Sequence, residues 1–467
     1  KECKLKYQTA KMVEIAETMG LEALNREIWE MEGAGTEADF TALCEAAHVL
    51  GMKIVLDGVF AHTGADSRYF NRFRHYPGCG AYNSSNSVYT HWYDFAHYPN
   101  DYRCWWNFRD LPAINTANPD WRKYMITGEH SVVKAWLHDG ASGWRLDVAD
   151  ELPDDVLRDL RTAAKQADPD SVLLGEVWED AVTKVSYGAR RQYALGDALD
   201  SVMNYPLRDA LIQFLTGRST ARALADLLLS QRLNYPQPLY YALMNLTASH
   251  DVARTRSALA LDFDPRSRTR AQLAALDVTD AMTARGAQLQ PLAAAVQFWL
   301  PGIPSIYYGD EAGMQGLCDP FNRAPLQMCD TQMLQWYAKL SALRHAHPAL
   351  QRGEIAVFAP AGDVVCILRI ITGGHDAFGA EAGDEALLLA VNRAAHTVRC
   401  HVELTCPGAG LNEETRLSFV RSGYDRALEC VTGARAAIHD GVAAFDLPPR
   451  SAQIYRLENR HGTETGS

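Results

Sequence analysis

Three acidic residues, each placed after an apolar run, constrain the fold of this chain most strongly. The acids, with the runs before them, are Asp147 (143–146), Glu176 (173–175) and Asp251 (241–246). A parallel barrel carries its chemistry where strands end, so carboxylates from three strands can converge on one pocket. The sequence therefore predicts an α/β fold of the (β/α)8 TIM-barrel type with an acidic site at the carboxyl ends of its strands.

β-rich runs and helical patterns alternate along the chain, as strand–helix units require. Lys53–Phe60 is predicted to be a strand, preceded by an amphipathic helix over Glu37–Leu50 with Thr36 as its N-cap. The apolar stretch Pro291–Gly309 is interrupted by Gln297 and two prolines, so it indicates a buried helix running into the last strand. The other predicted strands lie at Trp144, Leu173, Leu199–Met203, Tyr241–Leu246 and Ile303–Tyr308, and the predicted helices include Pro119–Leu137 and Pro206–Leu233.

The two ends of the chain depart from a simple barrel. A complete barrel needs two strands before Lys53, but the first fifty residues offer mainly helical stretches such as Leu21–Met31. We therefore expect the N-terminal strands to be missing, either because the chain is a fragment or because something else fills the gap. From Arg352 onward, short alternating segments separated by Gly and Pro predict an antiparallel β-sandwich. Four domains are predicted. Residues 1–61 form the incomplete N-terminal part of the barrel, 62–118 a long excursion out of the barrel after its third strand, 119–351 the remainder of the barrel, and 352–467 the sandwich.

The excursion 62–118 is rich in aromatic residues and poor in regular periodicity. Aromatic rings could wall one side of a sugar cleft, but most of them are expected to form the excursion's own small core. We expect Trp178, beside Glu176, to be the better candidate for a ring on which a sugar stacks.

Composition excludes several classes of protein. The formal charge of −12 and a pI near 5.7 argue against nucleic acid and anionic membranes as partners, which bind basic surfaces. The ten cysteines include no Cys-x-x-Cys pair, and no His-Glu-x-x-His motif for a zinc hydrolase occurs. A cytoplasmic location is expected, with a lost N-terminal leader left open because the chain begins at Lys1, and a homo-oligomer also stays open.

Paired carboxylates fit the cleavage of a glycosidic bond. That reaction passes through an oxocarbenium-like state and needs one acid for the leaving oxygen and one carboxylate at the sugar carbon. Glu176 suits the acid, because the apolar residues after it disfavour ionisation. Arg145 lies on the same strand face as Asp147 and would keep that carboxyl ionised, so Asp147 is the candidate nucleophile. Their carboxyl groups are expected to lie roughly 5 to 5.5 Å apart.

These three stretches resemble the conserved segments of the α-amylase superfamily of retaining glycosidases, and Asp57–His62 and Gly302–Glu311 resemble its first and strand-eight segments. The resemblance implies that Asp147 attacks, Glu176 protonates and Asp251 stabilises the transition state. The resemblance also implies further substrate contacts, by His62, Arg145, His250, Asp319, Arg323 and Tyr7. Tyr7 lies in a segment similar to the loop after strand two of the family. Asp57 is expected to have a supporting role at the site.

Within the superfamily the chain is most similar to the neopullulanase, cyclomaltodextrinase and maltogenic amylase group. Leu111–Asn115, Val148 and the run Asp319–Arg323 carry this similarity. Asp150 departs from the Asn usual in that group, and Ala113 replaces its Lys. Ala61 stands where the superfamily usually has Asn, and a methyl group cannot ligate a cation.

The sequence therefore predicts a retaining α-glycosidase for α-linked glucose oligomers or polymers, with hydrolysis and transfer to another sugar both open. The reaction needs no cofactor, and Ala61 argues against the calcium ion that the resemblance would otherwise allow. A glucan-binding or scaffolding relative without catalysis is the alternative: the intact triad argues against it, and Ala61 and the missing strands argue for it.

Overall fold

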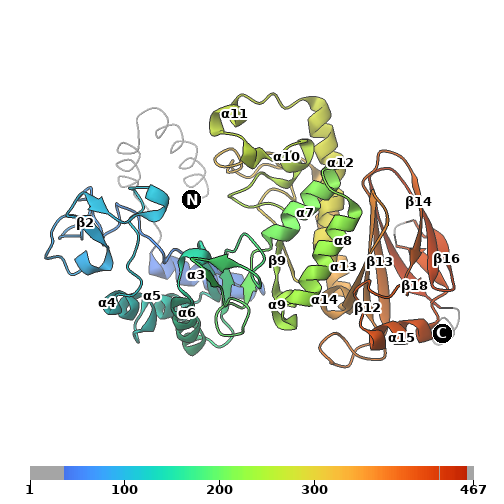
Figure 1. Ribbon diagram of the computed structural model, residues 1–467, viewed down its shortest axis with the longest axis horizontal. Coiled ribbons are helices and arrows are strands. Elements are labelled where there is room, and N and C mark those ends of the chain that lie inside the picture. The colour runs from blue at the N-terminus through green and yellow to red at the C-terminus, as the bar shows by residue number, and fades with distance from the viewer. Residues whose placement is uncertain (1–35, 431, 460–467) are drawn as a thin grey trace. The chain divides into compact units, whose positions relative to one another are not determined.

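The computed structural model describes residues 36–430 and 432–459, which form two compact units. The first unit ends at Met203 and the second begins at Asn204 (Figure 1). Tyr7 and the predicted helical stretch Leu21–Met31 lie before Thr36, outside the described residues. The predicted absence of two N-terminal strands concerns mainly the same part of the chain and stays a prediction. The predicted domain boundaries stay predictions.

A parallel sheet in the order β1-β4-β5-β8 forms the centre of the first unit. Its strands are β1 (Leu56–Gly58), β4 (Gly143–Leu146), β5 (Val172–Gly175) and β8 (Ser201–Val202). Among residues 36–203, the helices are α3 (Glu37–Val49), α4 (Pro119–Arg122), α5 (Val132–His138) and α6 (Asp154–Ala167), with shorter turns η1 (Thr90–Trp92), η2 (Trp105–Asn107), η3 (Lys123–Thr127) and η4 (Ala149–Glu151). The described part of the unit also contains two small hairpins, β2 (Phe95–His97) with β3 (Asp101–Tyr102) and β6 (Val185–Ser186) with β7 (Ala189–Arg190).

Local sequence signals explain two features of this unit. Thr36 caps α3 as predicted: its hydroxyl accepts the amide of Asp39 at 3.2 Å, and the Asp39 carboxylate accepts the amide of Thr36 at 2.8 Å. At the start of β4, a Cβ on Gly143 would lie 2.2 Å from the carbonyl oxygen of Val172 on the neighbouring strand. Only glycine allows β4 and β5 to approach so closely at this point.

The excursion forms its own aromatic core, as predicted for most of its rings. Phe70 is fully buried, and its ring centroid lies 4.9 Å from that of Tyr93 and 4.8 Å from that of Tyr102. Trp106 and Phe108 are different, since 72% and 56% of their surfaces are exposed. These two rings are therefore accessible to a ligand, although Trp106 also stacks on Trp105.

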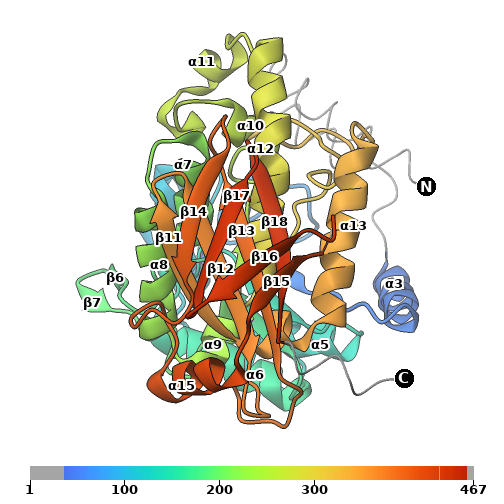
Figure 2. The same ribbon diagram turned by 90° about the vertical axis from the view of Figure 1, so that its right-hand side faces the viewer.

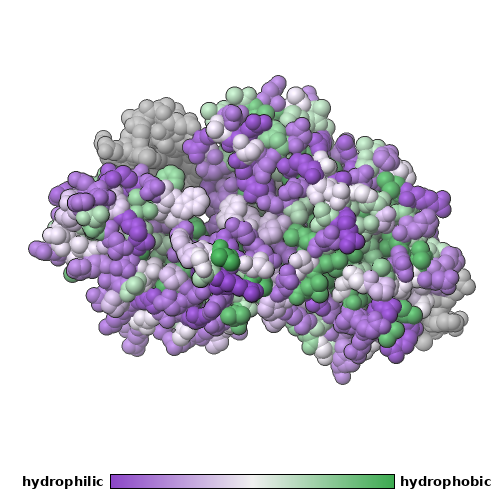
Figure 3. Space-filling model, in the orientation of Figure 1, coloured by the Kyte–Doolittle hydropathy of each residue, from purple (hydrophilic) through white to green (hydrophobic). Residues whose placement is uncertain are grey.

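The second unit begins with helices around a parallel strand pair, β9 (Met244–Leu246) and β10 (Ile303–Ser305). Its helices are α7 (Tyr205–Thr216), α8 (Ala221–Asn234), α9 (Gln237–Ala242), α10 (Thr255–Ala260), α11 (Arg270–Ala274), α12 (Asp280–Trp299), α13 (Thr331–Ala346), α14 (Pro348–Arg352) and α15 (Glu413–Ser422), with the short turn η5 (Pro265–Ser267). The helix α12 ends four residues before β10, which confirms the interpretation of the stretch 291–309. Within the described part of the chain, no helix is long and apolar enough to cross a membrane, and the face in Figure 3 is mostly hydrophilic.

Predicted elements are longer than the observed ones. The predicted helix 206–233 is divided between α7 and α8, because Gly217 adopts a left-handed conformation with φ of 83° and ends α7. The predicted helix 119–137 is interrupted by the π-helical turn η3 and by Gly128, whose backbone is extended. Strand 241–246 is shortened because α9 continues to Ala242.

The C-terminal residues form one antiparallel sheet of eight strands, shown in Figure 2, in the order β11-β12-β13-β18-β15-β16-β17-β14. The prediction of a sandwich of two sheets is therefore wrong, although the antiparallel pairing and the position in the chain are confirmed. The strands at the two ends of this order contact each other, so the sheet curls around a single core instead of stacking on a second sheet. The strands are β11 (Glu354–Ala361), β12 (Val364–Ile371), β13 (Glu385–Asn392), β14 (Val398–Glu403), β15 (Arg426–Glu429), β16 (Arg435–His439), β17 (Val442–Leu447) and β18 (Ser451–Glu458).

Candidate active site

The strand register of the first unit brings two acids together. Leu146 pairs with Gly175, so Asp147 and Glu176 each stand one residue beyond a paired position on neighbouring parallel strands. The amide of Glu176 donates to the carbonyl of Leu146 at 3.0 Å, which extends the ladder to this point. Both acids therefore lie at the carboxyl edge of the sheet, as predicted.

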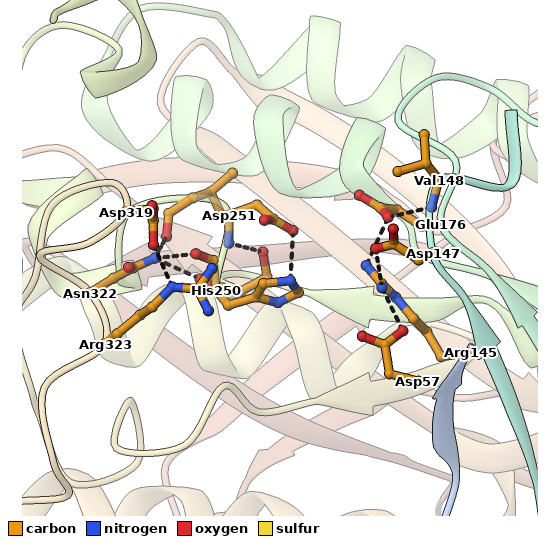
Figure 4. Close-up of polar contacts among 12 residues, drawn as sticks. Asp57, Arg145, Asp147, Val148, Glu176, His250, Asp251, Asp319, Asn322 and Arg323 are labelled. Atoms are coloured by element: carbon orange, nitrogen blue, oxygen red, sulfur yellow. Dashed lines mark hydrogen bonds and ion pairs between the residues drawn. The ribbon is translucent and has the colours of Figure 1, made fainter. Parts of the chain in front are cut away.

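Arg145 contacts three carboxylates at this edge (Figure 4). Its Nη1 lies 2.7 Å from Asp57 Oδ1 and 2.7 Å from Asp147 Oδ1, and its Nη2 lies 2.8 Å from Glu176 Oε2. Asp57 can reach it because Asp57 and Arg145 are register partners on β1 and β4. Burial opposes the charge on Arg145, but the three carboxylates outweigh it and raise the pKa of the guanidinium. The expected contact between Arg145 and Asp147 is thus present.

Glu176 is the most buried acid of this group, with 6% of its side chain exposed. Burial raises the pKa of its carboxyl group, against the opposing effect of three donors. These donors are the amide of Val148 at 2.8 Å, Nη2 of Arg145, and the indole nitrogen of Trp178 at 2.9 Å. Glu176 can therefore hold a proton at a higher pH than an exposed glutamate can.

Two backbone positions shape the surroundings of Glu176. Val148 adopts a left-handed conformation, φ 40° and ψ 61°, which is unfavourable for a β-branched residue. This conformation accompanies the hydrogen bond from its amide to Glu176. A Cβ on Gly175, the residue before the acid, would lie 2.5 Å from Leu199 Cδ1, so glycine leaves room for the Leu199 side chain. Sequence reasoning did not assign either position a structural role.

His62 lies in the first unit and is largely buried. Its ring stacks on Trp105 with centroids 5.4 Å apart, and burial lowers its pKa against the opposing charges of Asp147 and Glu151. Its Nδ1 is buried with no hydrogen-bond partner among residues 36–430 and 432–459. The negative charge of Asp147 therefore acts on the His62 imidazole, and the Nδ1 atom of His62 is available for a hydrogen bond.

Asp150, where the related group has Asn, has protein partners of its own. Tyr193 donates its hydroxyl to Asp150 Oδ1 at 2.5 Å, and Lys184 Nζ lies 3.1 Å from Oδ2. This carboxylate is therefore neutralised within the first unit.

The second unit holds the remaining predicted residues. His250 Nε2 lies 3.2 Å from Asp251 Oδ2, and the hydroxyl of Tyr205 lies 3.4 Å from the same oxygen. Arg323 forms an ion pair with Asp319, four residues before it in the chain, and Arg270 also contacts Asp319 at 3.4 Å. The Asp319 and Arg323 side chains are each more than 40% exposed, so the pair is available to a ligand but contributes little to stability.

Asn322 has a positioning role that sequence reasoning missed. It is fully buried, and its Nδ2 donates to the carbonyl oxygens of Ser249, His250 and Val252 at 3.1, 2.9 and 2.8 Å (Figure 4). The side chain therefore fixes the backbone that carries His250 and Asp251. The run 319–323 was noted in the sequence, but no local pattern indicates where an amide side chain will point.

The structure gives no fit for a calcium ion at Ala61. The residue has no side-chain ligand, and its carbonyl oxygen already accepts the amide of Ile114 at 3.0 Å. Across the described ranges, no cluster of three or more His, Cys, Asp or Glu side chains could hold a metal ion.

Comparison with known proteins decides the family. A family model described as the catalytic domain of alpha amylase matches residues 26–327. The chain belongs to the alpha-amylase family. This alpha-amylase homologue therefore has the TIM-barrel fold of that catalytic domain, followed by the curled antiparallel sheet.

Individual relatives agree with this assignment. An amylopullulanase from Thermoanaerobacterium thermosulfurigenes is 34% identical over an alignment of 449 positions that covers 89% of this chain and 22% of that protein. A cyclomaltodextrinase from Geobacillus thermopakistaniensis is 27% identical over 91% of this chain and 63% of its own length. Among solved structures, the chain resembles the cyclic alpha-maltosyl-(1-->6)-maltose hydrolase from Arthrobacter globiformis, in complex with cyclic alpha-maltosyl-(1-->6)-maltose. The TM-score is 0.66 at 24% sequence identity, and the match covers 90% of this chain and 79% of the Arthrobacter chain.

The predicted similarity to the cyclomaltodextrinase, neopullulanase and maltogenic amylase group is confirmed by relatives of all three kinds. The similarity to amylopullulanases was not predicted from the sequence. This alpha-amylase homologue spans less than a third of the length of the amylopullulanases that it matches.

Proposed function

We propose that this chain is a retaining α-glycoside hydrolase that cleaves α-glucans, maltooligosaccharides or cyclomaltodextrins by double displacement. The observation that carries the proposal is the pair Asp147 and Glu176, one residue beyond paired positions on adjacent strands and joined by Arg145. The family supplies the substrate class, since the Arthrobacter relative is described in complex with a cyclic maltosyl sugar.

The first step uses the two acids in opposite protonation states. The Asp147 carboxylate attacks the anomeric carbon while Glu176 gives its proton to the leaving glycosidic oxygen, which breaks the bond and forms a glycosyl ester. Arg145 donates a hydrogen bond to the Asp147 carboxylate, whereas burial raises the pKa of Glu176 and favours its neutral form.

The second step reverses these roles. Glu176, now ionised, takes a proton from water, the water oxygen attacks the anomeric carbon, and Asp147 leaves as a carboxylate. A sugar hydroxyl in place of water gives transfer. We assign Asp251, with His250 beside it, to stabilising the cationic transition state. His62, Asp319, Arg323 and the exposed ring of Trp106 are assigned to sugar binding, and the two steps need no metal or organic cofactor.

The alternative is a glucan-binding relative without catalysis. Incubation with maltotriose, cyclomaltodextrin and pullulan distinguishes the two, because an enzyme releases reducing ends whereas a binder is retarded in a glucan gel without releasing them. Glu176→Gln should lower turnover roughly 10²- to 10⁴-fold, and Asp147→Ala by several orders of magnitude, with unchanged circular dichroism. Full activity in either variant, or a β-configured first product, contradicts the proposal.

A further inference from the structure

The indole N–H of Trp178 donates a hydrogen bond to Glu176, the proposed acid. Its Nε1 lies 2.9 Å from Glu176 Oε1, and its side chain is half-buried. The sequence suggested a sugar platform, which requires an accessible ring face but makes no use of the indole N–H. The observed contact gives this N–H a specific acceptor.

The two oxygens of Glu176 are satisfied unequally. Oε2 accepts two hydrogen bonds, from Arg145 Nη2 and from the amide of Val148, each at 2.8 Å. Oε1 accepts one, from Trp178, among the described residues. A carboxylate oxygen has two lone pairs, so Oε2 is fully occupied whereas Oε1 retains one lone pair. The proton of the neutral acid can therefore be held at Oε1 without displacing a donor.

Resting on the proposed function, we propose that Oε1 is the oxygen of Glu176 that delivers the proton, and that Trp178 is the positioning residue that orients it. The indole N–H occupies one lone pair of Oε1 and fixes the rotation of the carboxyl group, while Arg145 and Val148 hold the other oxygen. The remaining lone pair of Oε1 then carries the proton to the glycosidic oxygen and receives one from water in the second step. Trp178 acts through Glu176 and forms no bond to the reacting atoms.

The variant Trp178→Phe removes the N–H and keeps an aromatic ring. A donor to a carboxylate favours the ionised form, so its loss should raise the pKa of Glu176 and move the basic limb of the kcat/KM profile upward by about one pH unit. Trp144→Phe is the matched control, because the indole nitrogen of Trp144 is buried with no hydrogen-bond partner in the described part of the chain. Its basic limb should not move.

Leaving groups provide a second readout. Poor positioning of the proton should slow the cleavage of maltotriose, whose leaving sugar needs protonation, more than the cleavage of an aryl α-maltoside with an acidic phenol. We expect the ratio of the two kcat values to change several-fold in Trp178→Phe. A sugar platform would instead raise KM for maltotriose and leave the pH profile unchanged, and that result overturns the inference.

Incorporation of 5-fluorotryptophan tests the same contact in the wild-type sequence, should Trp178→Phe fail to fold. A more acidic indole N–H donates a stronger hydrogen bond, so the basic limb should move to lower pH; an unmoved limb contradicts the inference. Glu176→Gln separates the two proposals. If that variant is fully active, the proposed function fails, whereas an inactive Glu176→Gln with an unmoved limb in Trp178→Phe overturns only the role of Trp178.

Discussion

Arg145 Nη1 lies 2.7 Å from Asp147 Oδ1, although the two residues are separated by only one position in the chain. Alternation along β4 and its continuation places both side chains on the same face, and the register with β1 and β5 brings Asp57 and Glu176 to the same guanidinium. One cation therefore separates three carboxylates that would otherwise repel one another.

Removing that cation should destabilise the first unit. The Arg145 side chain is 11% exposed and that of Glu176 is 6% exposed, so Arg145→Ala leaves the buried Glu176 carboxylate without its partner and should cost about 3–5 kcal/mol in the free energy of unfolding, measured in urea. The matched control is Arg222→Ala, because Arg222 pairs with Asp226 on the exposed surface of α8. That change should cost less than about 0.5 kcal/mol, and equal effects of the two changes would contradict the prediction.

Asn322→Ala should weaken the segment that carries His250 and Asp251. The change removes the donors to three carbonyl oxygens in a fully buried position, and we expect a loss of about 1–3 kcal/mol in unfolding free energy. We also expect kcat/KM to fall, because Asp251 loses its fixed position. The exposed Asn234, which bonds Ser230 at the end of α8, serves as the control, and Asn234→Ala should change neither quantity measurably. A stable, fully active Asn322→Ala protein would refute the positioning role.

Asp310 should make stability depend on pH. Burial raises its pKa from 3.8 to about 6, although Thr255 and Arg254 oppose the shift. The folded state therefore binds the proton more tightly than the unfolded state, so the contribution of Asp310 is fully present below pH 4 and is lost as pH rises through 6.

Comparison with Asp310→Asn isolates this effect, since asparagine does not titrate. The wild-type protein should gain about 2–3 kcal/mol relative to the variant between pH 7 and pH 4, measured by urea unfolding at each pH. Parallel stability curves for the two proteins would show that Asp310 does not titrate in this range.

Local patterns predicted some elements well and others poorly. The capping residues Thr36 and Asp39 act within one turn, so the start of α3 could be placed correctly from sequence. The division between α7 and α8 at Gly217 was missed, because the helical pattern continues on both sides of a residue whose left-handed conformation is visible only in the structure. The single curled sheet was also missed, since alternation shows that strands have two faces but not which strands pair.

The family, the order of the acidic segments and the common face of Arg145 and Asp147 could all be read from the amino-acid order. These properties depend on residue identity and on a period of two, which any reader of the chain can count. Three contacts became visible in the folded chain alone: Arg145 joins Asp57 to Glu176, Trp178 donates to Oε1, and Asn322 fixes the backbone near His250. Most of these contacts join residues tens of positions apart, and all of them depend on strand register or on how a side chain turns, which no local pattern specifies.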